Sequence, residues 1–162
     1  MKLQLIKKIL DHLKEELNVL LVAANNAHLA AIDEQSIAET QYDTLAIEAG
    51  YLAEGQSKRV EELKQAIVSF EHLSSIIKRG SDKDTHIKLG SIVQLSKDKV
   101  VNQYFFIGPA AAGFRCEIKN KKFTVITPQS PMGKSLLNKS VGDEFFIMLG
   151  NAQLEDEIIY LE

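Results

Sequence analysis

The sequence predicts an α+β protein, in which a long antiparallel α-helical coiled-coil hairpin precedes a small antiparallel β-sheet domain with one short helix. Apolar residues recur at helical spacing over residues 3–31 and again over 42–70. From residue 91 onward, short apolar runs alternate with turn residues, which is typical of strands. We therefore expect a hairpin over 1–78, a linker over 79–90 and a β-rich domain over 91–162.

Composition places the chain among globular proteins. Of its 162 residues, 45% are hydrophobic and 25% are charged. No apolar run reaches the roughly 18 residues of a membrane helix, and charges interrupt the N-terminal apolar stretch as they would not in a signal peptide. The single cysteine, Cys116, allows neither an internal disulfide nor a multi-cysteine metal site. These features predict a cytoplasmic protein without a membrane partner.

The first helical arm has a heptad seam with alternating steps of three and four residues. Leucine dominates the seam near its start, and alanine fills it toward residue 31, so that a partner helix could approach closely there. The seam residues are Leu3, Ile6, Leu10, Leu13, Leu17, Leu20, Ala24, Ala27 and Ala31.

The second arm repeats the pattern, with a stutter between Gln56 and Val60 that would unwind a coiled coil locally. Laid antiparallel, the arms pair best with Leu10 near Val60, which places the turn near residue 35. Ser36 and Glu39 form a capping box, the signature of a helix start. Asp33 and Glu34 then fall in the turn, and the tip of the hairpin lies near 33–39. The seam residues of this arm are Tyr42, Leu45, Ala49, Leu52, Gln56, Val60, Leu63, Ile67 and Phe70.

Charge is distributed unevenly along the hairpin. Between Lys14 and Lys58 there are eight acids and no lysine or arginine. Four of the acids, Asp33, Glu34, Glu39 and Asp43, lie at or near the expected tip. Such a segment is repelled by a nucleic acid backbone. It is either a functional acidic tip or simply a solvated acidic face.

The C-terminal part contains no catalytic constellation, because it lacks a Ser–His–Asp grouping, a P-loop and a dinucleotide-binding glycine pattern. Cys116 lies in a strand pattern without an activating partner nearby in sequence, which favours a packed residue over a nucleophile. One short helix is expected over 131–137, with Pro131 at its first position. The expected strands are 91–96, 102–108, 114–119, 123–127, 143–149 and 157–162.

Several motifs of the chain resemble those of the bacterial Gre transcript-cleavage factors (GreA and GreB). The resemblance covers nearly the whole chain, and its most specific part lies within residues 126–148. The matching residues of the C-terminal domain are Leu89-Gly90-Ser91-x-Val93, Ile107-Gly108-Pro109, Ser130-Pro131-x-Gly133, Leu136-Leu137 and Val141-Gly142-Asp143. Those of the return helix are Tyr42, Gly50-Tyr51 and Glu54-Gly55.

This resemblance implies an FKBP-like C-terminal domain that docks on RNA polymerase, and a hairpin that enters the polymerase's secondary channel. Acids at the tip would help to hold a transient Mg²⁺ in the polymerase active site, which carries out the RNA cleavage. The chain would then be an accessory factor and no enzyme, with no stably bound cofactor or metal. It would meet nucleic acid only through the polymerase. The docking residues implied by the motifs are Ser130, Pro131, Gly133, Gly142 and Asp143.

The tip departs from the Gre pattern. The two positions that carry an Asp-x-x-Glu pair in cleavage factors are Gln35 and Ala38 in this chain. Neither side chain supplies a carboxylate, so we expect channel entry with weak or absent stimulation of cleavage. The remaining acids that could assist the metal are Asp33, Glu34, Glu39 and Asp43. Two other functions stay open: an FKBP-like prolyl isomerase or chaperone, which the lack of tryptophan disfavours, and a purely structural coiled-coil interaction protein.

Overall fold

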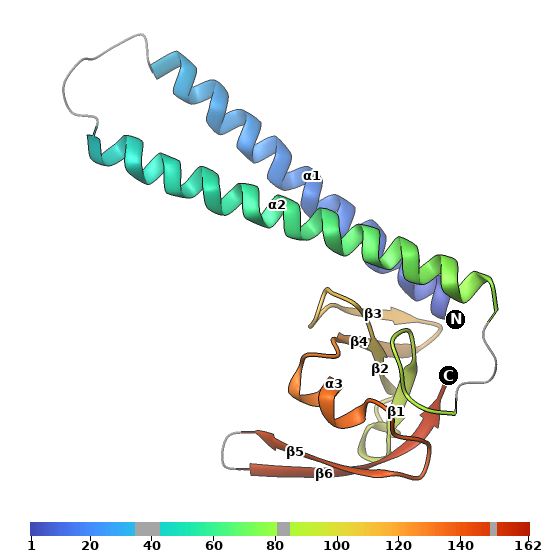
Figure 1. Ribbon diagram of the computed structural model, residues 1–162. Coiled ribbons are helices and arrows are strands. Elements are labelled where there is room, and N and C mark those ends of the chain that lie inside the picture. The colour runs from blue at the N-terminus through green and yellow to red at the C-terminus, as the bar shows by residue number, and fades with distance from the viewer. Residues whose placement is uncertain (35–42, 81–84, 150–151) are drawn as a thin grey trace. The chain divides into compact units, whose positions relative to one another are not determined.

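The computed structural model describes the backbone of residues 1–34, 43–80, 85–149 and 152–162 (Figure 1). The side chains of 25–34, 43–54, 148, 149, 152 and 154 lie outside the description. The chain divides into two compact units, one made of Met1–Leu10 with Val68–Glu162 and the other of Asp11–Ile67. The described elements belong to the α+β class that the sequence predicts.

Two long helices, α1 (Lys2–Glu34) and α2 (Asp43–Lys78), account for the first half of the chain. The helix α1 continues through Asp33 and Glu34, which corrects the expectation that both residues form the turn. No glycine or proline interrupts α1, so nothing in its sequence stops the helix earlier. The expected helix start at Ser36 and the tip acid Glu39 lie outside the described residues.

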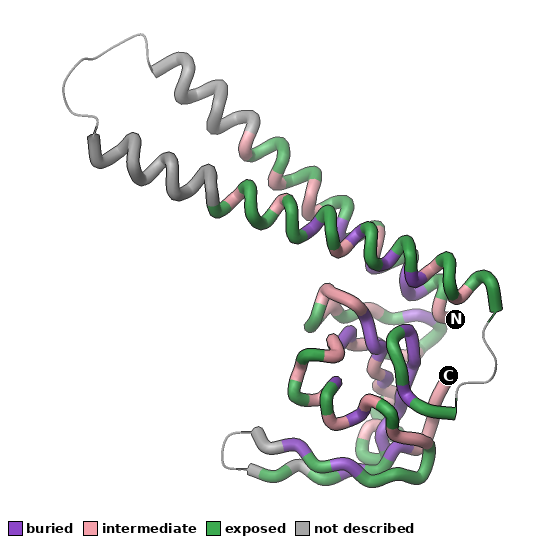
Figure 2. The backbone as a smooth tube through the Cα atoms, in the orientation of Figure 1, coloured by how far each residue is buried: buried purple, intermediate pink, exposed green. Residues whose placement is uncertain are grey.

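The buried face at the start of α1 differs from the expected seam. Leu3 is 40% exposed, whereas Leu5 and Ile9 are fully buried beside the expected Ile6 and Leu13. The first ten residues belong to the same compact unit as the sheet, so this part of α1 buries a wider face than a two-helix seam requires. On α2 the expected seam holds, because Leu63, Ile67 and Phe70 are buried. Figure 2 shows these buried positions as a purple stripe along the described helices.

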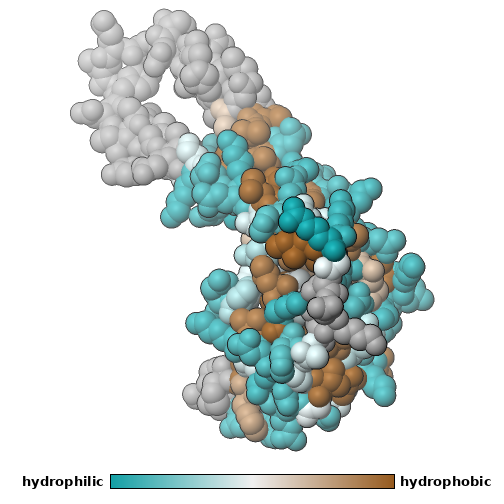
Figure 3. Space-filling view, turned by 45° about the vertical axis from the view of Figure 1, so that its right-hand side comes forward, coloured by the Kyte–Doolittle hydropathy of each residue, from teal (hydrophilic) through white to brown (hydrophobic). Residues whose placement is uncertain are grey.

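Apolar side chains also reach the surface of the helices. Val19 and Val22 of α1 are 61% and 51% exposed, and Val68 of α2 is 65% exposed. Figure 3 shows hydrophobic side chains among hydrophilic ones over the described part of the helices. No helix in the described part of the chain is both long and apolar enough to cross a membrane.

The C-terminal part forms a six-stranded sheet in the order β3-β4-β2-β1-β6-β5. A short 3-10 helix η1 (Ser96–Asp98) follows β1, and α3 (Pro131–Leu136) follows β4. The strands are β1 (Ile92–Leu95), β2 (Gln103–Ile107), β3 (Arg115–Ile118), β4 (Lys121–Ile126), β5 (Glu144–Leu149) and β6 (Ala152–Leu161).

The sheet is mixed, which corrects the expected antiparallel arrangement. Strand β4 pairs in parallel with β2, from Gln103 opposite Lys122 to Ile107 opposite Ile126. Strands β3 and β4 form a tight hairpin whose turn residues, Lys119 and Asn120, both have positive φ (51° and 61°), as a type I′ turn requires. Strand β3 lies at the outer edge, so the second strand of this hairpin, β4, is the one that pairs with β2.

Strand β6 begins earlier than the sequence predicts, at Ala152 instead of residue 157. It pairs with β5 along its first half, from Leu149 opposite Ala152 to Glu144 opposite Glu157. In the stretch before and after residue 157, exposed Glu155 and Glu157 alternate with buried Asp156 and Ile158. This alternation is the period of a half-buried strand.

The core of the C-terminal part lies between the sheet and α3. Its buried members are Ile87, Val93, Leu95, Ile107, Ile126, Leu136, Phe145, Ile147 and Ile158. A second contact joins the sheet to the helices of its own unit. A β-carbon on Gly108, which follows β2, would lie 3.1 Å from the Phe70 ring of α2, and one on Gly90 would lie 3.1 Å from Leu73. Small residues at these places let α2 approach the sheet closely.

Candidate functional site

The motif Ser130-Pro131-x-Gly133 builds the start of α3. The Ser130 hydroxyl accepts a hydrogen bond from the Gly133 backbone N–H at 3.0 Å and donates one to the Thr127 carbonyl at 2.7 Å. Pro131 occupies the first turn, where its missing N–H costs no helical hydrogen bond. Serine and proline here are therefore explained by helix capping.

Gly133 is required by close packing. A β-carbon at this position would lie 1.9 Å from the carbonyl oxygen of Thr127, a distance that no side chain can occupy. The glycine is buried and lets α3 lie directly against the end of β4. Of the motif, Ser130 and Pro131 reach the surface, whereas Gly133 acts through the backbone.

Gly142 and Asp143 form the turn that leads into β5. Gly142 has a φ of +92°, a conformation that favours glycine, and its N–H donates to the Ile158 carbonyl at 2.8 Å. The Asp143 carboxylate accepts a hydrogen bond from the Ser140 backbone N–H at 2.7 Å. The Asp143 carbonyl accepts from the Ile158 N–H at 3.1 Å. Both residues thus attach the turn to β6.

An apolar hollow of about 320 Å³ lies beside the start of α3. Pro131 is exposed at its edge, and Ser130 and Met132 are half-buried. The hollow brings together the end of β4, the middle of β5 and the segment before β3. It is lined by Ala112, Gly113, Thr124, Val125, Ile126, Ser130, Pro131, Met132 and Ile147. Of the expected docking residues it contains Ser130 and Pro131, whereas Gly142 and Asp143 lie outside it.

Three of the four acids expected at the hairpin tip lie at the ends of the two long helices. Asp33 and Glu34 are the last residues of α1 and Asp43 is the first of α2, but their side chains lie outside the description. Glu39, with Gln35 and Ala38, lies outside the described residues altogether. The described helices therefore fix only where this segment begins and ends.

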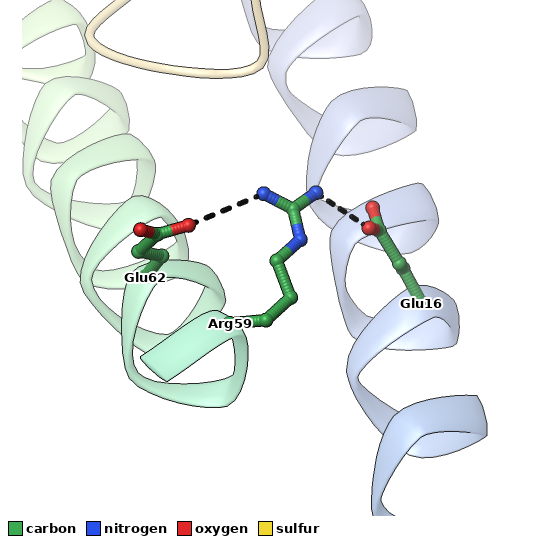
Figure 4. Close-up of polar contacts among 3 residues, drawn as sticks. All are labelled: Glu16, Arg59 and Glu62. Atoms are coloured by element: carbon green, nitrogen blue, oxygen red, sulfur yellow. Dashed lines mark hydrogen bonds and ion pairs between the residues drawn. The ribbon is translucent and has the colours of Figure 1, made fainter. Parts of the chain in front are cut away.

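A polar cluster of Glu16, Arg59 and Glu62 joins α1 and α2 within their described parts (Figure 4). Arg59 of α2 bonds the Glu16 carboxylate of α1 at 2.6 Å and the Glu62 carboxylate of its own helix at 3.5 Å. The hydrogen bond to Glu16, and to a lesser extent Glu62, raises the pKa of Arg59 above its ordinary value. The expected pairing of the arms places Glu16 opposite residue 54, and the long Arg59 side chain reaches Glu16 from five residues further along α2.

Sequence reasoning overlooked Arg59, although a signal was present. Arg59 and its neighbour Lys58 are the first basic residues after the stretch that contains only acids. Glu16 is among the first acids of that stretch. A pairing chosen from apolar residues alone tolerates a shift of one turn, because apolar residues recur with nearly that period. The charged pair adds a contact between the helices that the apolar spacing does not contain.

Cys116 lies half-buried on β3, in agreement with the expectation of a packed residue. Burial raises the pKa of the Cys116 thiol, and the nearby charge of Lys8 partly offsets the increase. His86 contacts the Ser140 hydroxyl through Nδ1 at 2.8 Å. Among the residues that the structure describes, no group of three His, Cys, Asp or Glu side chains is arranged to hold a metal ion.

Comparisons with known proteins found neither a matching family model nor a curated relative. Solved structures of the transcription factor Gfh1 do align with the chain. One such structure is 21% identical with a TM-score of 0.35, over 98% of this chain and 92% of that chain. Gfh1 from Thermus aquaticus covers the same shares at 21% identity and a TM-score of 0.33. Gfh1 from Thermus thermophilus, a GreA factor homologue, aligns over 99% and 94% at 22% identity and a TM-score of 0.35.

These alignments cover nearly the whole length of the chain.

Proposed function

We propose that this chain is an accessory transcription factor of the Gre type. It binds RNA polymerase through its C-terminal sheet and inserts its helix pair into the secondary channel, where it modulates elongation or transcript cleavage. The observation that carries the proposal is the pair of long helices, of 33 and 36 residues, combined with the stretch from 15 to 57 that holds eight acids and no basic residue. At 1.5 Å per residue, each helix is about 50 Å long.

The helix pair is suited to carry acids to a metal. Carboxylate oxygens are the ligands that Mg²⁺ prefers, and Mg²⁺ needs few of them because it keeps waters and substrate phosphates. Asp33, Glu34, Glu39 and Asp43 are the acids available near the tip. Gln35 and Ala38 replace the carboxylates of the cleavage factors, so the factor enters the channel with weak or absent stimulation of cleavage.

The apolar hollow beside α3 is the docking surface of this proposal. Pro131 offers an exposed apolar side chain at its edge, and Ser130 offers a neighbouring hydroxyl. The same hollow argues against prolyl isomerisation, because no aromatic side chain is among the residues that line it. An isomerase site requires a deep aromatic pocket, which this lining does not supply.

Binding of the full chain to purified polymerase core is tested by native mass measurement. Each variant is then compared with the wild-type chain by competition for the core in solution. The wild-type chain is expected to associate with the core. Pro131→Glu, which a helix N-terminus tolerates, is expected to weaken association at least about fivefold by placing a charge at the apolar hollow. Lys134→Glu, an exposed residue of the same helix, is the control and should stay within about twofold. The absence of wild-type association would overturn the proposal.

Cleavage is tested separately, on a stalled transcription complex with and without the chain over a range of Mg²⁺ concentrations. We expect little trimming of the RNA. Efficient trimming that disappears in Asp33→Ala or Glu39→Ala would show that other tip acids replace the missing pair. A variant with all four tip acids changed to Asn or Gln should lose its effect on the polymerase. An unchanged effect would instead favour a purely structural hairpin.

A further inference from the structure

A second hollow, of about 500 Å³, lies on the sheet and shares the lining residue Thr124 with the apolar hollow beside α3. It is lined by Gln103, Phe105, Arg115, Cys116, Glu117, Lys122, Phe123 and Thr124. The strand register explains this set. Lys122 of β4 stands opposite both Gln103 and Glu117, and Thr124 stands opposite both Phe105 and Arg115. Directly opposed residues share one face of a sheet, so six of these side chains form two adjacent rows on the same face.

The side chains of this face combine an aromatic ring with positive charge. Phe105 packs against the core but stays half-buried, and it lines the hollow. Arg115 lies in the Thr124 row and Lys122 in the neighbouring row, and both are exposed. Glu117 is the only acid in the lining. The side-chain amide of Gln103 donates a hydrogen bond to the Thr124 hydroxyl at 2.9 Å. This bond holds the two polar side chains together within the hollow.

Positive charge continues from the hollow into two neighbouring turns. The turn between β3 and β4 carries Lys119, and the connection between β1 and β2 carries Lys99. The two turns are fastened together, since the Lys122 N–H donates to the Asn102 carbonyl at 3.0 Å and the Asn102 side chain donates to the Asn120 carbonyl at 2.5 Å. Lys99 and Lys119 are both exposed.

These four cations are available for a ligand. Arg115, Lys122, Lys119 and Lys99 form no ion pair with another residue in the described ranges. Lys121 is different, because it lies over the rings of Tyr104 and Tyr160 on the opposite face, at 4.5 and 5.5 Å. We therefore leave Lys121 out of the surface, which we call the basic sheet face and define as Phe105, Arg115, Lys122, Lys119 and Lys99.

We propose that the basic sheet face binds single-stranded nucleic acid, with a base against Phe105 and the phosphates along Arg115, Lys122, Lys119 and Lys99. An aromatic ring on an open sheet takes an unstacked base, which a single strand offers and a duplex does not. The four cations pair with the backbone without reading sequence. This goes beyond the proposed function, because the contact is direct and needs no polymerase.

The opposite charge of the two parts of the chain supports this placement. Residues 15–57 hold eight acids and no lysine or arginine, so they would repel a nucleic acid. Residues 78–162 hold 12 basic residues against 10 acids. Four of these basic residues form the basic sheet face. An acidic protein surface would meet the same cations but would make no use of the ring, so it is the competing outcome of the test.

The test is fluorescence anisotropy of a labelled oligouridine RNA of about 12 nucleotides with the full chain, at several salt concentrations from about 50 mM upward. Arg115→Glu and Lys122→Glu are each expected to weaken binding at least about fivefold and to reduce the salt slope by about 0.7 per cation removed. Phe105→Leu keeps an apolar residue against the core. It should weaken binding about fivefold while leaving the salt slope unchanged, because stacking is lost but no charge is.

The matched control is Lys134→Glu, which makes the same charge change in the same unit outside the basic sheet face and should stay within about twofold. Thermal unfolding of each variant checks that it remains folded. If Phe105→Leu unfolds, the role of the ring is decided by competition with polyglutamate, which meets the cations but makes no use of the ring. The proposal is overturned if the wild-type chain does not bind at about 50 mM salt. It is equally overturned if a duplex of the same length binds as well, or if polyglutamate competes as well as unlabelled RNA.

Discussion

Gly133 of α3 lies so close to the Thr127 carbonyl that a β-carbon would come within 1.9 Å of its oxygen. The contact is with backbone, which cannot swing aside as a side chain could. Glycine at this place is therefore a requirement of the fold, whatever the motif does in binding. The same contact positions Ser130 and Pro131 at the apolar hollow, because it fixes where α3 begins.

Gly133→Ala is expected to lower the free energy of unfolding by about 3 kcal/mol, because α3 must move away from β4 to admit the methyl group. Chemical denaturation measures the loss. The matched control is Gly55→Ala, since a β-carbon at Gly55 in α2 meets nothing within 4 Å. Alanine there should be neutral or stabilise by up to about 1 kcal/mol through helix propensity. Equal effects of the two substitutions would contradict the close contact.

A double-mutant cycle on Glu16→Gln and Arg59→Gln measures the bond between the two helices. The side chains are 33% and 50% exposed, so solvent screens the pair. We expect a coupling energy of about 0.5 kcal/mol, which shrinks as salt is added. Glu62→Gln paired with Arg59→Gln is the comparison within one helix, and its coupling should be smaller because that contact is 3.5 Å long. No coupling between Glu16 and Arg59 would contradict the observed pairing of the helices.

Asp98 predicts a dependence of stability on pH. Burial, and secondarily the nearby Asp156 carboxylate, raises the pKa of Asp98 above its ordinary value. The folded protein therefore disfavours the ionised form, and it loses stability as the pH rises from the usual pKa through the raised one. Asp98→Asn should increase the melting temperature at neutral pH. The increase should vanish below the ordinary carboxyl pKa of about 4, where wild-type Asp98 is uncharged in both states.

Cys116 predicts slow thiol chemistry. Because burial raises the pKa of the thiol, less thiolate is present at pH near 8 than in an exposed cysteine, and alkylation by iodoacetamide should be slower. Lys8→Ala should slow the reaction further, since the Lys8 charge lowers the pKa of Cys116. The control is Lys7→Ala, an exposed neighbour with the same loss of charge. Alkylation as fast as that of free cysteine would show that the thiol is not buried.

Much of the architecture could be predicted from periodicity. The two helices and the short α3 appear where the apolar spacing and Pro131 placed them. All six strand runs match observed strands, although β6 starts at Ala152. Such local patterns are readable because each element buries one face with its own period. The start of β6 was harder to recognise, because the exposed position 155 and the buried position 156 both carry acids, so no apolar residue marks the buried one.

The candidate sites could be predicted only in part. The motif residues Ser130, Pro131, Gly133, Gly142 and Asp143 were found from the sequence, but their capping and turn contacts emerge only from the structure. The basic sheet face was not foreseen. Its members come from three strands and two turns, and no sequence spacing brings Phe105, Arg115 and Lys122 together.

The sequence by itself determined the order of helices and strands, the stretch from 15 to 57 without lysine or arginine, and the start of α3 at Pro131. These depend on local period, composition and neighbouring residues. Only the tertiary structure decided that β4 runs parallel to β2, that Glu16 meets Arg59 and that Gly133 lies against Thr127. Each of these depends on which distant segments pack together, and packing selects among registers that are nearly equal in local pattern.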